Sequence, residues 1–286
     1  MSSAFGQLFT RWDVPPVVTS ALVLTALTYI RGWIRIRKTR TALFPFWRLF
    51  CFLGGILALF VAVASPLDTF SESLLIMHMG QHYVFISVAP PLLLFGAPVV
   101  PLLRGLPAWF VRVPLGPLLR TPRIRRIARF LIRPQVAWMA MNVSFVAWHV
   151  PRAYEFALRS ENWHNVEHLC FFLTSLLFWW PVIAPWPSRS ISARWILIPY
   201  LLLADFVNTG VSALLCFSGR LLYPSYGEIQ RPFGLSALND QSAAGAFMWV
   251  VGSVVFLIPA VAITAQSLSA NHRHSLQAPE FGNSES

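Results

Sequence analysis

Long apolar runs separated by short polar connections extend along most of the chain. A helix needs about 20 mainly apolar residues to cross the hydrocarbon core of a bilayer, and about seven of the runs come near that length. The sequence therefore predicts an all-α fold, a polytopic membrane helix bundle of about seven transmembrane helices. The expected spans are Val14–Arg31, Trp47–Ser65, Leu74–Phe95, Arg133–Val150, His164–Ala184, Trp195–Phe217 and Ser242–Gln266.

One further apolar stretch, Gly96–Leu119, is broken by prolines and glycines. We expect it to lie at the membrane interface as irregular or short helical structure. Six spans are an alternative, and eight would result if this stretch dips into the bilayer. The expected organisation is a short extracytoplasmic N-terminus (1–13), one membrane domain (14–266) and a disordered cytoplasmic tail (267–286).

Lysine and arginine residues concentrate in alternate connections between the expected spans. Of the 22 such residues, the ones on the opposite side are Arg11, Arg152, Arg159, Arg220 and Arg231. Basic connections stay in the cytoplasm, so we expect the N-terminus outside and the C-terminus inside the cell. The first residues lack the basic and short apolar regions of a cleaved signal peptide, and we expect them to be retained.

Composition supports a membrane bundle and indicates lipid, and not nucleic acid, as a partner. Hydrophobic residues make up 56% of the chain and charged residues 12%, whereas soluble domains carry roughly 25% charged residues. The net charge of +11 comes from arginines between apolar spans, where we expect contact with anionic lipid at the cytoplasmic loops and not with nucleic acid. The three cysteines lie apart in apolar runs and form no disulfide framework.

Five of the seven histidines fall at the non-cytoplasmic ends of the expected spans. They open span three, close span four and open span five: His78, His82, His149, His164 and His168. The first two and the last two form i, i+4 pairs, which places each pair on one helix face with Cβ atoms about 5–6 Å apart. The remaining two, His272 and His274, belong to the polar tail, where we expect them to be solvated.

Two chelating pairs with a histidine from a third helix predict a metal site, because ionisable groups in a membrane face the bundle interior. Imidazole binds copper, zinc and iron, and the thioether of Met79 would favour copper in its cuprous state. We expect Asp240 to be either the N-cap of span seven or a ligand or its orienting partner, and Glu167 to orient a neighbouring histidine. The alternative is that these histidines pack at the interface and bond to backbone.

Other chemistries are less well supported. Facing histidines can ligate haem axially, but i, i+4 pairs would then have spare members. A carboxylate-bridged di-iron site needs several inward glutamates, and only Glu167 is near. Asp205, midway along span six, is expected either to bond Asn208 or Thr209 or to serve as an ion relay. The chain has no GxSxG, Walker or HExxH motif, so we expect no enzyme activity.

Six sequence segments occur together in a distinctive order: HMGQH followed by PPLLLFGAP, then WHVPRAYEFAL, then HNVEHLCFF followed by LFWWPVIAP, and finally LNDQSAAGAFMW. In this order they resemble the CtaG family, the bacterial membrane proteins that assist assembly of cytochrome c oxidase, over about Asp68 to Pro259. The resemblance implies a role in making an active haem–copper oxidase in the bacterial cell membrane. The resemblance implies no particular set of metal ligands, so the histidines are assigned as ligands from their positions along the expected spans.

The resulting hypothesis is that the bundle binds copper at its outer face and supports copper loading of the oxidase. The expected metal ligands are His78, His82, His149, His164 and His168, with Met79 and Asp240 as further candidates. The expected partners are oxidase subunits or other copper chaperones. Alternatives from other classes are a membrane transporter for copper or another metal, a haem-binding electron carrier, and an oxidase scaffold without metal.

Overall fold

The computed structural model describes residues 12, 14–188, 193–227 and 234–277, with side chains up to residue 269. Its regular structure is helical, and no strand occurs in this part of the chain, which confirms the all-α prediction. The long helices are α2 (Pro16–Arg37), α3 (Phe46–Ala64), α11 (Pro134–His149), α13 (Glu161–Ile183), α14 (Leu197–Phe217) and α15 (Ala237–Gln277). The expected third span is divided into α5 (Leu75–Tyr83), the π-helical turn η2 (Val84–Val88) and α6 (Ala89–Phe95).

Five helices are long and apolar enough to cross a membrane, namely α2, α3, α13, α14 and α15, and the span at α14 includes the preceding turn η4 (Arg194–Ile196). A sixth span results if the helical pair Leu75–Phe95 and Val99–Gly105, bent by 69°, crosses as one. The remaining expected span corresponds to α11, which has 16 residues. A count of seven spans and the orientation of the termini stay predictions.

The proline pair after the π turn explains why the third expected span is not a single regular helix. Pro90 has no N–H to donate to the carbonyl of Ile86 one turn earlier. The indole N–H of Trp179 in α13 donates to this carbonyl instead, at 2.9 Å. The lost helical bond is thus replaced by a contact between α13 and the broken helix, and this contact fixes the depth of α5 against α13.

The connection after α6 forms the short helices expected for Gly96–Leu119: α7 (Val99–Gly105), α8 (Ala108–Phe110), the π turn η3 (Val111–Leu115) and α9 (Gly116–Arg120). Glycines allow α7 to lie directly on α2. A Cβ atom on Gly32 would stand 1.8 Å from the backbone oxygen of Pro101, and one on Gly105 would stand 1.8 Å from that of Thr28. Close backbone approach at small residues is a common way for membrane helices to associate.

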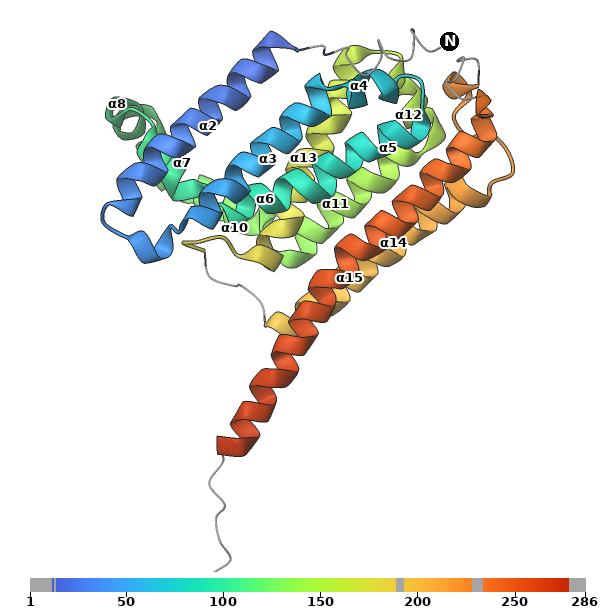
Figure 1. Ribbon diagram of the computed structural model, residues 1–286. Coiled ribbons are helices and arrows are strands. Elements are labelled where there is room, and N and C mark those ends of the chain that lie inside the picture. Colours follow the sequence, from blue (N-terminus) through green and yellow to red (C-terminus); the bar gives the residue numbers. More distant parts are fainter. Residues whose placement is uncertain (1–11, 13, 189–192, 228–233, 278–286) are drawn as a thin grey trace, which may run out of the picture.

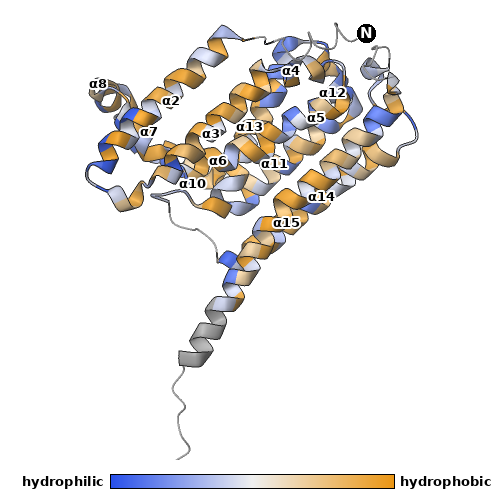
Figure 2. Ribbon diagram, in the orientation of Figure 1, coloured by the Kyte–Doolittle hydropathy of each residue, from blue (hydrophilic) through white to orange (hydrophobic). Residues whose placement is uncertain are grey.

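The two ends of the bundle differ in character. One end carries α4 (Pro66–Ser71), α12 (Pro151–Leu158) and η5 (Pro224–Tyr226) around the start of α5, whereas the arginine-rich α10 (Pro122–Leu131) lies at the other (Figure 1). Apolar residues dominate the long helices between them (Figure 2). Helix α15 extends beyond the others and continues past Gln266 to Gln277.

Of the terminal segments expected outside the membrane domain, residues 1–11 and 13 and residues 278–286 lie outside the described residues. So do the side chains of His272 and His274, although the backbone there is helical. These expectations stay predictions.

Polar side chains inside the bundle bond between helices. The Tyr83 hydroxyl donates to the Asn208 side-chain oxygen at 2.6 Å and also lies 2.8 Å from the Met248 carbonyl. Asp205 accepts a hydrogen bond from Ser253 of α15 at 3.0 Å. This hydrogen bond of Asp205 thus runs to a neighbouring helix, and not to the expected Asn208 or Thr209 one turn further along α14.

Candidate metal centre

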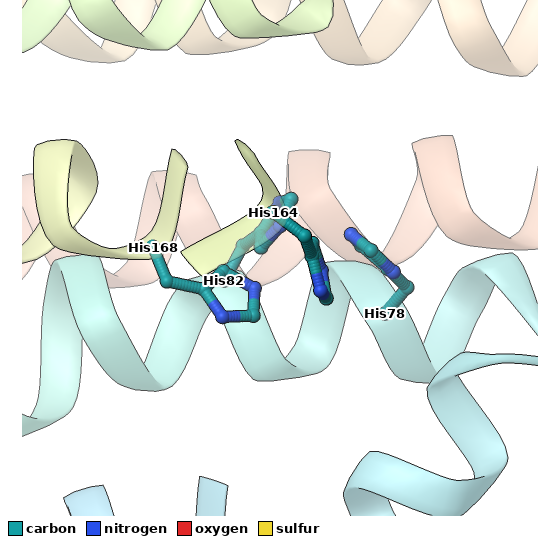
Figure 3. A group of neighbouring side chains, drawn as sticks. All are labelled: His78, His82, His164 and His168. Atoms are coloured by element: carbon teal, nitrogen blue, oxygen red, sulfur yellow. The ribbon is translucent and has the colours of Figure 1, made fainter. Parts of the chain in front are cut away.

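Four histidines from two helices meet at the end of the bundle that carries α4 and α12. His78 and His82 come from α5, and His164 and His168 from α13. One ligand nitrogen from each lies within 4.8 Å of those of the other three. Figure 3 shows the four rings gathered between the two helices. We call these four residues the histidine cluster. The structure therefore unites both i, i+4 pairs.

The fifth expected ligand adjoins the cluster on one side. The ring of His149, at the end of α11, has its centroid 6.1 Å from that of His82. The His149 ring also contacts the rings of Phe145 and Phe171. The three helix ends predicted from the sequence thus bring all five histidines into one region.

Burial and hydrogen bonding favour metal binding over simple packing. His78 and His82 are each 1% exposed, and His149 and His168 are also buried. In all five histidines the Nε2 atom is buried without a hydrogen-bond partner among the described residues. Buried polar atoms are rarely left unpaired, because each costs about 1–3 kcal/mol. Five unpaired ring nitrogens in one place fit a metal ion that takes imidazole ligands.

Two of the rings are held so that Nε2 is the atom with the free lone pair. The Tyr226 hydroxyl donates to the Ser71 carbonyl at 2.8 Å, and so its oxygen is available to accept from His78 Nδ1 at 3.1 Å. His149 Nδ1 lies 2.7 Å from the Phe145 carbonyl and must donate to it. A ring N–H bound in this way fixes the tautomer and orientation of a metal-ligating histidine.

Tyrosines that the sequence reasoning missed cover the cluster. Tyr154, Tyr223 and Tyr226 are fully buried, and they come from α12 and from the connection between α14 and α15. Burial raises the pKa of the Tyr154 and Tyr223 hydroxyls well above the ordinary value, so both stay neutral hydrogen-bonding groups. The Tyr223 hydroxyl donates to the His149 carbonyl at 3.0 Å.

A cavity of about 760 Å³ leads to the cluster. Its wall contains His78, His164 and His168, and it also contains the acidic residues Asp68, Glu72 and Glu161. His164 is only partly buried, unlike the other cluster members. The cavity therefore gives an ion access to the histidines along a wall that carries these three carboxylates and one basic residue, Arg159.

The two other candidate ligands have different settings. Met79 is fully buried in the apolar core. Asp240 is also fully buried, and its two carboxyl oxygens accept hydrogen bonds from the backbone N–H groups of Leu75 and Ile76 at 2.8 and 3.2 Å. Asp240 therefore caps α5 across the bundle, and its expected roles as N-cap of span seven and as metal ligand stay predictions. It positions the turn that carries His78.

Replacing Asp240 by alanine is expected to weaken both the fold and the metal site. The first N–H groups of α5 would lose their acceptors, and hydrogen bonds to a charged group contribute about 1.5–3 kcal/mol each. The thermal unfolding midpoint in detergent and the copper affinity should both fall. Asp240→Asn, which keeps one acceptor oxygen, should give an intermediate result. An unchanged midpoint and affinity in Asp240→Ala would contradict the positioning role.

A family model described as cytochrome c oxidase caa3 assembly factor (Caa3_CtaG) matches residues 27–270. The chain belongs to this family. The match includes all five histidines of the candidate metal centre and Asp240, and it confirms the resemblance found in the sequence segments.

The curated relatives share about a quarter of the aligned residues with this chain. An uncharacterized protein of Mycobacterium leprae is 24% identical over 272 residues, which is 93% of this chain and 41% of the relative. Uncharacterized proteins of Mycobacterium bovis and Mycobacterium tuberculosis are each 24% identical over 269 residues, which is 91% of this chain and 40% of theirs. The chain thus spans about two fifths of the length of these relatives. No solved structure matches the chain significantly.

Proposed function

We propose that this assembly factor binds copper at the histidine cluster and supports the copper loading of cytochrome c oxidase. The observation that carries the proposal is the set of five buried Nε2 atoms without hydrogen-bond partners. Membership of the family connects the chain to the assembly of cytochrome c oxidase, whose active form contains copper. Imidazole is a common copper ligand. The site would lie on the extracytoplasmic side, opposite the arginine-rich connections.

Copper is the cargo in this proposal and not a structural ion. Delivery requires release to an oxidase subunit or to another copper chaperone, so the ion must be able to leave. The cavity beside His78, His164 and His168 supplies such a route. A site with neutral imidazoles and an open side also differs from closed structural sites, in which the protein fills every coordination position.

The direct test is elemental analysis of the purified detergent-solubilised protein after loading with copper under reducing conditions, with an optical spectrum of the same sample. Near-stoichiometric copper without a haem band is expected. A protein that takes up no copper under these conditions would contradict the proposal and favour a scaffold role. A haem band would favour the electron carrier instead.

A metal transporter is the second candidate, because polar residues continue into the bundle beyond the histidine cluster. Tyr83 with Asn208 and Asp205 with Ser253 form hydrogen-bonded pairs between helices. Copper flux measured in proteoliposomes separates the two functions. A loading factor should bind copper without sustained transport, whereas a transporter should accumulate the ion across the vesicle membrane.

The carboxylates of the cavity wall are expected to accelerate copper uptake. Glu72 and Glu161 are exposed at this wall and attract cations, and such steering raises association rates and weakens as salt screens the charges. Replacing both by glutamine should slow copper(II) quenching of tryptophan fluorescence several-fold at low salt and leave the equilibrium affinity unchanged. Equal rates in the variant and the original protein at low salt would argue against steering.

We also propose that α10 rests on anionic lipid at the cytoplasmic face. None of its residues is buried, and it combines four arginines with exposed Ile127, Phe130 and Leu131, as in helices that lie in a membrane interface. Replacing Arg123, Arg125, Arg126 and Arg129 by glutamine should lower the phosphatidylglycerol that co-purifies with the protein. Replacing Arg152 and Arg159, near the opposite end, should not. Equal lipid content in both variants would contradict this contact.

A further inference from the structure

The group that the histidine cluster leaves unexplained is Glu167. This residue precedes His168 on α13, is 0% exposed, and has two carboxyl oxygens without a hydrogen-bond partner among the described residues. Buried acids are normally paired or bound to metal, because a charge without a partner is strongly disfavoured away from water. The other buried acid, Asp240, is satisfied by backbone N–H groups. Glu167 must therefore either carry a proton or bind a cation.

A cation bound to Glu167 would lie between this residue and His82. Glu167 Oε1 is 3.8 Å from His82 Nε2, which is too long for a hydrogen bond. Metal bonds of about 2.0–2.2 Å place two ligand atoms of one ion about 3.4 Å apart at the tetrahedral angle and about 4.1 Å apart when they are opposed. The observed separation falls within that range, so one ion can bind both atoms.

His149 completes the same position from a third helix. Its Nδ1 is engaged by the Phe145 carbonyl, and its buried Nε2 is unpaired. The 6.1 Å between the ring centroids of His82 and His149 is close to the roughly 6.4 Å of two imidazoles on opposite sides of one ion. Helices α5, α11 and α13 thus bring two imidazoles and one carboxylate into the same region.

We propose that His82, His149 and Glu167 form a second, inner metal position, distinct from the outer one at His78, His164 and His168. The cavity wall contains the outer three histidines, and the inner three residues are absent from it. An ion from the cavity therefore meets the outer position first. His82 has both ring nitrogens unpaired and belongs to the four-histidine cluster, so it can turn one nitrogen to each position and, as a neutral ring, bind one ion at a time.

The inner position suits a divalent cation such as copper(II), because Glu167 supplies the negative charge that neutral imidazoles lack. This inference rests on the proposed function, since it concerns the same cargo. It assigns Glu167 as a metal ligand, whereas its position beside His168 in the sequence indicates only an orienting role.

The test uses a variant in which the outer position is dismantled by His78→Ala and His164→Ala. After copper(II) loading and dialysis, it is expected to retain one ion per chain through the inner residues. Adding Glu167→Gln to this variant should weaken copper(II) binding at least tenfold, in line with the roughly 10–100-fold effects of removing groups that only orient ligands. Its copper(II) electron paramagnetic resonance spectrum should also shift. The matched control adds Glu161→Gln, on the cavity wall, and should change neither.

Different failures have different meanings. If the original protein binds copper(II) but the outer-position variant binds none, the inner position does not exist and the proposed function stands. If Glu167→Gln and Glu161→Gln have the same small effect, Glu167 is not a ligand. If the original protein binds no copper in either oxidation state, the proposed function fails together with this inference. Size-exclusion profiles and unfolding midpoints identify any variant that has lost its fold, and His149→Gln then provides an independent removal of an inner ligand.

Discussion

Replacing His78 and His82 together by alanine is expected to abolish stoichiometric copper binding and to leave the oxidase short of copper. The change removes two of the four clustered ligands, and it removes the residue that joins the outer and inner positions. The copper affinity should fall by roughly 100-fold or more, because even groups that only orient ligands contribute 10–100-fold. Copper content of the purified factor and activity of the oxidase in the same cells measure the two effects.

The control for this double variant is replacement of the two tail histidines, His272 and His274, which keeps the number of substitutions the same. That control should retain copper and oxidase activity. Immunoblots must show equal amounts of each variant in the membrane. Normal oxidase copper and activity in the His78/His82 variant at equal protein level would refute the copper-loading function.

Replacing Gly32 by leucine is expected to destabilise the fold without removing the metal site. A side chain at this position would meet the backbone oxygen of Pro101, 1.8 Å from the new Cβ, and backbone atoms cannot rotate away. Overpacking usually costs about 1–3 kcal/mol, and a rigid contact belongs at the upper end of this range. The unfolding midpoint should fall clearly, while copper bound per folded chain should stay unchanged.

Gly210 provides the matched control for this substitution. It is a helical glycine in α14 with nothing within 4 Å of an added Cβ, so Gly210→Leu should have a small effect on the midpoint. If Gly32→Leu and Gly210→Leu unfold at the same temperature, the close contact between α2 and α7 does not contribute to stability. If Gly32→Leu binds less copper per folded chain, the two ends of the molecule are coupled.

Much of the fold follows directly from the sequence, because membrane helices must satisfy their own backbone hydrogen bonds. The long runs of apolar residues locate α3, α13 and α14 to within three residues, whereas α2 and α15 continue past their expected ends, Arg31 and Gln266, to Arg37 and Gln277. The prolines at 90 and 91 indicate where the third expected span is interrupted. What the pattern does not predict is the replacement of the lost bond by Trp179, since that pairing depends on how α13 packs.

The site residues that lie on helices were predictable from helical periodicity. Those in connections, or those whose partners belong to another helix, were not. Spacing places His78 with His82 and His164 with His168, and the distribution of basic residues brings the third helix end to them. Tyr226 lies in a connection without periodicity, and only its contact with His78 reveals it. Asp240 was expected at the start of its own helix, where it lies, but its bonds to the backbone groups of another helix were not expected. Such pairings arise from tertiary packing.

The segment that carries His78 and His82 is tied at both ends to other helices. Asp240 of α15 binds its first N–H groups, and Trp179 of α13 binds the Ile86 carbonyl beyond its last turn. Its position is therefore set by the protein before an ion arrives. A ligand set arranged in advance needs little reorganisation when an ion binds, and this strengthens the binding. In kinetic terms, the double attachment of α5 should make loading fast, and release should then depend on a competing ligand that enters through the cavity beside His164.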